Sequence, residues 1–298
     1  MTILKIVSEY HGGKGFVTAE QAIPSPNTLT EAVGFWVAGE PTPQKGQMRE
    51  DKDLQKWRGA IQAGARMNII SKGKMGAFQP VSVILQFATD EKHRLDYLCR
   101  STLDGLTHSG LLHDDSAIVD LVATRRPANQ SPTGATGCHV AIIPGELIYG
   151  KTKNWLTAFT QQHPPLARKL VDGIPRTMPD KKKGDSGGKF PEWSASVERA
   201  FTGVKLPKRA SLICEFKLGR WLEPDGIHYP IVNGRDVDKL SKSIAASLGI
   251  DLVDLVASKR LGEPGAKIDV YDGPILGASV LNEMLGTWGG LHGAWSTS

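Results

Sequence analysis

The feature that most constrains the fold of this chain is a phrase that occurs twice. Residues 119–126 read VDLVATRR, and residues 253–260 read VDLVASKR. Their β-branched and aliphatic content predicts a buried strand in each place. A helix is predicted before each strand, because apolar residues recur at a period of 3.6 over residues 95–106 and 237–248. The fold must therefore accommodate the same helix–strand unit twice.

The likeness extends to other elements on both sides of a stretch at 176–192 that is rich in Gly, Pro and Lys and is typical of a linker. A repeat of this length, present twice, indicates gene duplication rather than a solenoid. The further predicted elements are strands at 2–7, 32–39, 80–90 and 209–219, a helix containing Leu54, Trp57, Ile61 and Ala65, and a helix at 194–204.

We therefore predict an α/β (α+β) fold with two similar domains, each a small mixed sheet with helices packed on it. A chain of 298 residues is long enough for two domains of ordinary size. The predicted boundaries are an N-terminal extension at 1–34, a first domain at 35–150, a helical segment and linker at 151–192, a second domain at 193–275 and a Gly-rich tail at 276–298.

Composition narrows the class of protein. The net charge of +5 and the pI of about 9.0 are compatible with a polyanionic partner. The three cysteines form no CxxC pair, which argues against a zinc site or a disulfide framework. No apolar run approaches the roughly 20 residues that a membrane-spanning helix needs. We expect a soluble cytoplasmic protein with no membrane partner.

The two copies differ in their acidic residues. In the first, Asp96 opens the helix, and Asp114 and Asp115 lie in the loop before the strand. In the second, Asp238 stands at the place of Asp96, but the loop is eight residues shorter and has no acid pair. A basic residue follows four positions after each helix acid, on the same helix face, at Arg100 and Lys242. Each feature alone is typical of a surface ion pair or a solvated turn, but recurrence favours a functional site.

Converging carboxylates of this kind suit phosphodiester hydrolysis. Magnesium takes hard oxygen ligands, neutralises charge that develops on the phosphate and helps to generate hydroxide. An Arg or Lys one helical turn away can stabilise the same charge. His113, beside the loop acids, could assist a water molecule, but a bystander role is favoured.

The stretch at 95–120, LDYLCRSTLDGLTHSGLLHDDSAIVD, resembles the signature of the RusA-type Holliday junction resolvases, a mostly phage-borne endonuclease family. The family pattern is roughly D-x-D-N-x-x-K, a further D, and then D-D before a strand. GEPTPQKGQ at 39–47 resembles the N-terminal part of the same family. The resemblance spans residues 35–143 in the first repeat. It reaches the second repeat, 194–271, mainly through that repeat's kinship with the first.

This resemblance implies a compact α/β domain, a dimer, dependence on Mg²⁺ with Mn²⁺ able to substitute, and cleavage of branched DNA such as four-way junctions during recombination and repair. The duplication would place both halves of the dimer in one chain, as an intramolecular pseudo-dimer. The chain departs from the pattern, because Arg94, Tyr97 and Arg100 replace the first Asp, the Asn and the Lys of the family in the first repeat. In the second repeat Asp251 is the only acid near the place of the missing loop pair.

Three accounts of these departures stay open. Each half could bind metal with a reduced set, one half (the first is favoured) could be the nuclease while the other is a DNA platform, or neither could cut. A site shared between Asp236 and Asp238 on one side and Asp114 and Asp115 on the other would require the two helices to meet.

The expected residues follow from the resemblance and from the recurrence of cations. The predicted metal ligands are Asp96, Asp114, Asp115, Asp236 and Asp238, and the predicted catalytic residues are Asp96, Asp114, Asp115, Arg100 and Lys242. The predicted DNA-binding residues are Lys45, Arg49, Lys52, Arg125, Arg126, Lys259 and Arg260. The leading hypothesis is a magnesium-dependent, junction-cutting endodeoxyribonuclease. The alternatives are a non-catalytic, structure-selective DNA-binding protein and, less favoured, a structural phage protein.

Overall fold

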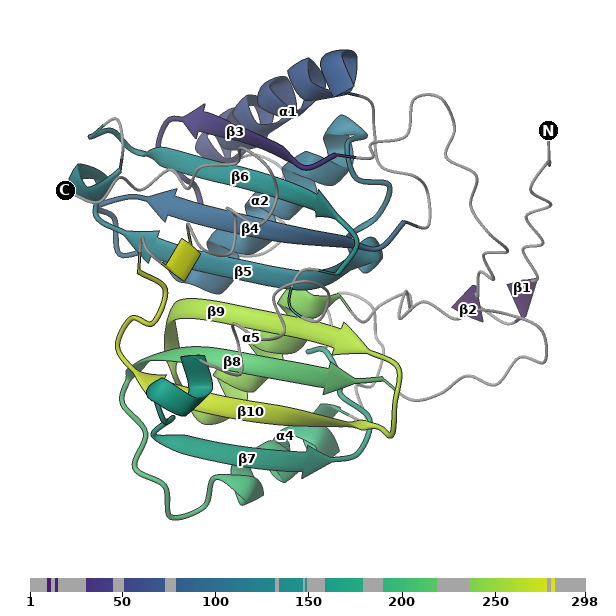
Figure 1. Ribbon diagram of the computed structural model, residues 1–298, viewed down its shortest axis with the longest axis vertical. Coiled ribbons are helices and arrows are strands. Elements are labelled where there is room, and N and C mark those ends of the chain that lie inside the picture. The colour runs from purple at the N-terminus through teal and green to yellow at the C-terminus, as the bar shows by residue number, and fades with distance from the viewer. Residues whose placement is uncertain are drawn as a thin grey trace.

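The computed structural model describes part of the chain, namely residues 10–11, 14–15, 31–44, 51–72, 79–131, 134–146, 148, 159–178, 190–218, 236–277 and 280–281. These residues form one mixed eight-stranded sheet with α-helices packed on one face, apart from the two-residue strands β1 (Tyr10–His11) and β2 (Lys14–Gly15), which pair with each other (Figure 1). None of the helices described is long and apolar enough to cross a membrane.

The elements of the sheet divide into two halves with the same order of strands and helices. The first half contains β3 (Val33–Ala38), α1 (Lys52–Lys72), β4 (Val81–Ala88), α2 (Leu95–Ser109), the short 3₁₀-helix η1 (Asp115–Ala117), β5 (Ile118–Arg126), the 3₁₀-helix η2 (Ala128–Gln130) and β6 (Gly137–Pro144). The second half contains β7 (Ala167–Asp172), α4 (Phe190–Ala200), β8 (Arg209–Lys217), α5 (Val237–Leu248), β9 (Asp251–Arg260) and β10 (Gly265–Asp272).

The strand order is the same in both halves when it is read outward from the centre of the sheet. The full order is β3-β6-β4-β5-β9-β8-β10-β7. In each half the strand nearest the centre is parallel to the next strand outward (β5 with β4, β9 with β8), and the two pairings beyond it are antiparallel. Antiparallel pairing of β5 with β9 joins the halves. The sheet is therefore continuous, and it does not form the two separate domains that the sequence predicts.

Small features recur at corresponding places in both halves. The parallel pairing shifts register near Ser82 in the first half and near Ser211 in the second. The Ser82 hydroxyl donates to the carbonyl of Gly145 at 2.8 Å, and the Ser211 hydroxyl donates to the carbonyl of Gly273 at 2.5 Å. Sequence-distant details of this kind repeat only if the whole supersecondary unit repeats, which supports duplication.

The helices end as the sequence predicts, and their apolar faces form the core. Gly110 after α2 and Gly249 after α5 adopt positive φ values of 81° and 65°, a left-handed conformation that favours glycine at a helix C-terminus. Leu95, Leu98 and Ile244 are fully buried on the helix-covered face of the sheet. The second face carries a smaller apolar cluster around Ile84, Val122, Val256 and Tyr271.

The sequence predictions of the individual elements are mostly confirmed, and the error concerns the region before the second helix–strand unit. β3, α1, β4, α4 and β8 lie where the corresponding strands and helices are predicted, although α4 begins at residue 190 rather than 194. The predicted helical segment and linker at 151–192 instead contains β7, which pairs with β10 at the edge of the sheet. The predicted strand at 2–7 lies outside the described residues, as do the linker residues 179–189 and most of the tail.

Candidate active site

Helices α2 and α5 lie next to each other over the centre of the sheet, where the two halves meet (Figure 1). Each helix also contacts the central strand of the opposite half, α2 with β9 and α5 with β5. The condition for a shared site, that the two helices meet, is therefore fulfilled. Two clusters of charged residues flank this contact, and we call them the acidic end and the arginine end.

The acidic end comprises Asp114 and Asp115 of the first half, Asp236 and Asp238 of the second half, and the basic residues Arg100, Lys239 and Lys259. Arg100 of α2 lies at its centre. Its Nη1 donates to Oδ2 of Asp115 at 2.9 Å and lies 3.6 Å from Oδ2 of Asp238. A single guanidinium therefore links acids from both halves.

Asp104 sets the orientation of Arg100. Its Oδ1 lies 3.1 Å from Nη2 of Arg100, one helical turn away, and its Oδ2 accepts a hydrogen bond from Arg58 of α1 at 2.5 Å. Thr107 in turn donates its hydroxyl hydrogen to Oδ1 of Asp115 at 2.5 Å. Arg100 and Asp115 are thus held in place by side chains of α1 and α2 before any ligand is present.

Asp238 is the most deeply placed acid of the cluster. It is buried, and its Oδ1 atom has no hydrogen-bond partner. Burial raises the pKa of Asp238 to about 6, against the opposing effect of Arg100, and the nearby charges of Asp236 and Asp115 raise it further. Asp236 forms an ion pair with Lys239, one turn along α5. The acids of α5 and of the η1 loop therefore influence one another directly.

Lys259 lies beneath these acids. Its Nζ donates to the carbonyl of Ser116 at 2.6 Å, and only 1% of the residue is exposed. Burial lowers the pKa of Lys259 to about 8, although Asp236 and Asp238, with the loop acids, act in the opposite direction. The predicted contact of Lys259 with DNA stays a prediction, and in this structure the ammonium group is buried and its hydrogen bond is directed inward.

Asp114 is the exposed member of the cluster. It caps η1, and its Oδ1 accepts a hydrogen bond from the backbone N–H of Ser116 at 2.7 Å. Partial burial raises the pKa of Asp114, but the hydrogen bonds from Ser116 and the charges of His113 and Lys239 outweigh it, so the pKa is lowered overall. For the neighbouring Asp115, burial is the larger influence and raises the pKa.

The arginine end occupies the place that corresponds, in the duplicated fold, to the acidic end. It comprises Arg94, Asp96, Asp251, Arg125, Arg209 and Lys242. Arg94 donates from Nε and Nη2 to the two oxygens of Asp96, at 3.0 and 3.1 Å. Asp251, the first residue of β9, interacts electrostatically with both Arg94 and Arg125. Asp96 is therefore occupied by an arginine at this end, whereas the loop acids lie with the acids of α5.

Lys242 mirrors Arg100 across the contact between the helices. Its Nζ lies 4.5 Å from the ring centroid of Tyr97 on α2, and the guanidinium carbon of Arg94 lies 5.0 Å from the same centroid. These distances are within the range of cation–π attraction. Each helix thus directs its basic residue toward the first turn of the other, and Lys242 does not join the acidic end.

The fit of these residues to a magnesium ion is mixed. The acidic end offers carboxylate oxygens, the donors that Mg²⁺ prefers, and Oδ1 of Asp238 is buried with its hydrogen-bonding capacity unused. However, no three His, Cys, Asp or Glu residues in the described parts of the chain are placed to hold a metal ion together. The cations Arg100, Lys239 and Lys259 lie among the acids instead. The predicted ligand set of the first half is not gathered, because Asp96 lies apart from Asp114 and Asp115.

The predicted DNA-binding residues differ in their surroundings. Arg126 is committed to the fold, since it donates to both oxygens of the buried Asp254 at 2.7 and 2.9 Å and to the carbonyl of Leu276 at 2.7 Å. Its contact with a phosphate stays a prediction, and these hydrogen bonds give Arg126 a structural role. Lys52 is exposed at the start of α1, and Arg125 and Arg260 are half-buried. Lys45 and Arg49 lie outside the described residues.

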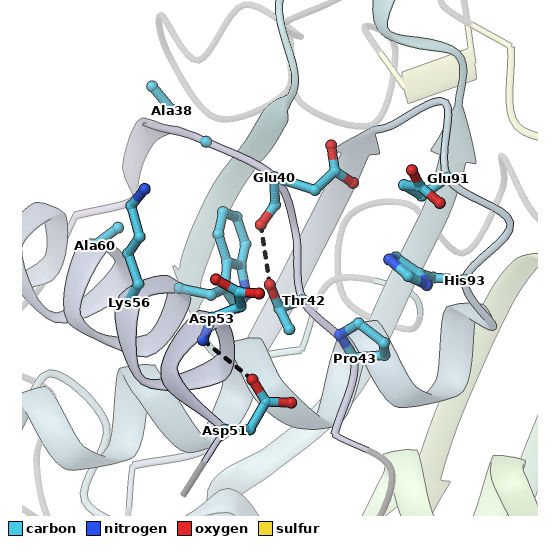
Figure 2. A pocket seen from close by; sticks show the side chains of 12 residues that line it. Ala38, Glu40, Thr42, Pro43, Asp51, Asp53, Lys56, Ala60, Glu91 and His93 are labelled. Carbon is cyan, nitrogen blue, oxygen red and sulfur yellow. Dashed lines mark hydrogen bonds between the residues drawn. The ribbon is translucent and has the colours of Figure 1, made fainter.

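A pocket of about 500 Å³ lies in the first half, and no sequence prediction concerned it. Figure 2 shows Glu40, Glu91 and His93 on one side of it, and Asp51, Asp53 and Lys56 at the start of α1 on the other. Asp51 caps α1 by accepting from the backbone N–H groups of Asp53 and Leu54, at 3.0 and 3.1 Å. Acidic side chains are prominent in the lining of this pocket. Their negative charge disfavours a phosphate group, so we do not assign DNA binding to the pocket.

The residues that sequence reasoning missed are the partners that complete each end. Lys239 carries no motif. Arg209 is among the cations that the sequence offers for phosphate contact, but the register between β8 and β9 is needed to place it beside Asp251. Comparison with protein-family models finds no family that matches this chain, and comparison with curated proteins finds no match.

Proposed function

We propose that this protein is a magnesium-dependent endodeoxyribonuclease that cuts branched DNA such as four-way junctions, and that its two halves act as an intramolecular pseudo-dimer of the RusA type. The observation that supports it most is the acidic end, where Asp115 and Asp238 from opposite halves approach the same guanidinium of Arg100. In this proposal one working site is assembled from both halves, rather than from the first half alone.

Asp236 and Asp238 would hold the magnesium ion, with water and phosphate oxygens as its other ligands, and Asp115 and the more exposed Asp114 would lie beside it. When bound, the ion would supply charge neutralisation at the phosphate and a more acidic water molecule. Arg100, oriented by Asp104, would stabilise negative charge on the phosphate. Lys259 lies beneath the acids. Its positive charge would balance part of their negative charge when no metal is bound.

The pseudo-dimer is supported by the sheet. Each half repeats the same strand order and pairings, and the two halves join through their equivalent central strands, as two subunits related by a two-fold axis would. Equivalent strands pairing with each other is the isologous contact of a symmetric dimer. Here a single chain provides both partners.

Incision of a synthetic four-way DNA junction tests the proposal. Purified protein is incubated with a junction whose four strands carry separate labels, with Mg²⁺, with Mn²⁺ and with a chelator. We expect metal-dependent incision that Asp236→Asn and Asp238→Asn slow on the order of a hundredfold. Asp272→Asn, at an exposed residue at the end of β10, serves as the matched control and should cut like the unmodified protein. Absence of incision with either metal would refute the enzyme assignment.

A second candidate is a non-catalytic protein that binds branched DNA. It is favoured by the lack of three metal-binding side chains placed together among the described residues, and by the presence of Arg100 among the acids. It predicts junction binding that weakens as salt rises, survives Asp96→Asn, and is accompanied by no cleavage in any divalent metal.

A further inference from the structure

The arginine end occupies the place where a symmetric dimer would carry a second copy of the acidic end. The first residues of β8 and β9 lie side by side there, because Arg209 is paired in register with Asp251. Arg125, near the end of β5, corresponds in the repeat to Lys259, near the end of β9. Residues at the arginine end therefore have counterparts at the acidic end.

The arginine end has gained a cation and lacks the loop acids. Arg94 stands at the place of Asp236, and the shorter loop between α5 and β9 has no counterpart of Asp114 and Asp115. The remaining acids are Asp96 and Asp251, and both oxygens of Asp96 accept hydrogen bonds from Arg94. The cations at this end are Arg94, Arg125, Arg209 and Lys242, so positive charge is in excess.

Arg125 is the residue whose surroundings point most clearly to an anion. Its Nη1 atom is buried and has no hydrogen-bond partner. Burial lowers the pKa of Arg125, Asp251 opposes this, and the nearby charges of Arg209 and Arg126 lower it further. Arg126 cannot share its own counter-ion, since Asp254 accepts from Arg126, Thr124 and two backbone N–H groups. A guanidinium left in this state is stabilised by an additional anion.

We propose that the arginine end is a binding site for a DNA phosphate, formed by Arg125 and Arg209 with Arg94 and Lys242 at its rim, in place of a second nuclease site. A phosphodiester oxygen can accept from a guanidinium, and Arg is suited to this geometry. The inference rests on the proposed function for the identity of the polyanion. Its consequence is that one end of the pseudo-dimer cuts and the other holds, so that one chain nicks one strand of a junction at each binding event.

Binding without cleavage provides the first test. Fluorescence anisotropy of a fluorescein-labelled synthetic four-way junction is measured in a chelator, over a series of salt concentrations, for Arg125→Gln and Arg209→Gln. Loss of one phosphate contact should weaken binding about eightfold at 0.1 M salt and reduce the salt slope by about 0.9. Arg199→Gln, the same change at an exposed residue of α4, is the matched control and should leave both quantities unchanged.

Folding is checked by thermal unfolding of each variant. Arg209 is exposed at the start of β8, so its substitution decides the question even if Arg125→Gln unfolds. Junction affinity and salt slope equal to those of the unmodified protein in Arg209→Gln, or in a folded Arg125→Gln, would overturn the inference.

The number of nicks provides the second test and separates this inference from the proposed function. With all four strands labelled and protein below junction concentration, we expect singly nicked products to form first, and paired cuts to appear only at excess protein. Concerted paired cuts by one chain would overturn the inference while leaving the nuclease assignment intact. If the unmodified protein makes no cut and the arginine variants bind the junction more weakly, the phosphate site is supported and the nuclease assignment is refuted.

Discussion

The acidic end and the arginine end occupy equivalent places in a duplicated fold, yet they carry opposite charge. At the acidic end, Asp236 and Asp238 meet the loop acids Asp114 and Asp115, and Arg100 links the two halves. At the arginine end, Arg94 replaces an acid, the loop pair is missing and Arg125 has an unpartnered nitrogen. In the proposed nuclease one copy of the cutting site is enough, which leaves the other copy free to diverge.

The residues that did not change show what the fold requires. Asp120 and Asp254 stand at the same place in the repeated phrase, and each accepts a hydrogen bond from the backbone of the segment after the last strand of its own half. The N–H of Ile148 donates to Asp120 at 3.1 Å, and that of Leu276 donates to Asp254 at 2.8 Å. Acids that hold the framework were kept in both halves, whereas acids at the two ends diverged. Position in the fold therefore separates structural from functional carboxylates.

The largest expected effect concerns Arg100, the basic residue that links acids from both halves. Arg100→Ala should reduce the free energy of unfolding by about 3 kcal/mol, because it leaves the largely buried Asp115 and Asp238 without their shared cation. Chemical denaturation measures the change, and Arg66→Ala on the exposed face of α1 is the control. A loss below about 1 kcal/mol would show that the acids at this end do not depend on Arg100.

The next effect sharpens the difference between the ends by incision. Asp238→Asn should slow metal-dependent cutting of a four-way junction on the order of a hundredfold, because it removes a charged oxygen donor from the proposed site. Asp96→Asn, the same change at the corresponding position of the first half, should have a much smaller effect, since Asp96 pairs with Arg94. Equal losses in the two variants would mean that the ends are functionally equivalent.

Much of the local structure could be predicted from the sequence, because it depends on short-range patterns. The 3.6-residue period places α2 and α5, and Gly110 and Gly249 mark their ends. The strand β7 was missed because it is a short edge strand whose charged and apolar residues do not alternate regularly, and its place is decided by pairing with β10. A segment of this kind carries little signal until its partner is known.

The assembly of the site depends on a contact that the sequence could not establish. The repeated strands are buried on both faces, so their composition does not tell which strand lies beside them. Pairing of β5 with β9 brings α2 against α5, and this places Asp115 near Asp236. The residue types of the site were therefore predicted, whereas their grouping was not.

A smaller effect is expected in the pH dependence of stability. The pKa of Asp238 is about 6 in the folded protein and its ordinary value is 3.8, so between these pH values the folded state binds more protons than the unfolded state. The free energy of unfolding should therefore fall as pH rises from about 4 through 6, by at most about 1.4 kcal/mol per pH unit from this group. Asp238→Asn should remove this contribution when urea denaturation is measured across the range. An unchanged slope in the variant would contradict the placement of Asp238 among acids in a buried site.

The smallest effect tests whether Lys242 is the true counterpart of Arg100. Its ammonium group lies over the ring of Tyr97 rather than among carboxylates, so Lys242→Ala should cost about 0.5–1 kcal/mol of stability. A double-mutant cycle with Tyr97→Leu isolates the pairwise contribution, because leucine removes the ring face and keeps an apolar side chain. If the arginine end holds a phosphate, Lys242→Ala should also weaken junction binding slightly in a chelator, with the largest difference at low salt. A coupling energy near zero, together with unchanged junction binding, would leave Lys242 as a surface lysine and confine the asymmetry between the ends to Arg94, Arg125 and Arg209.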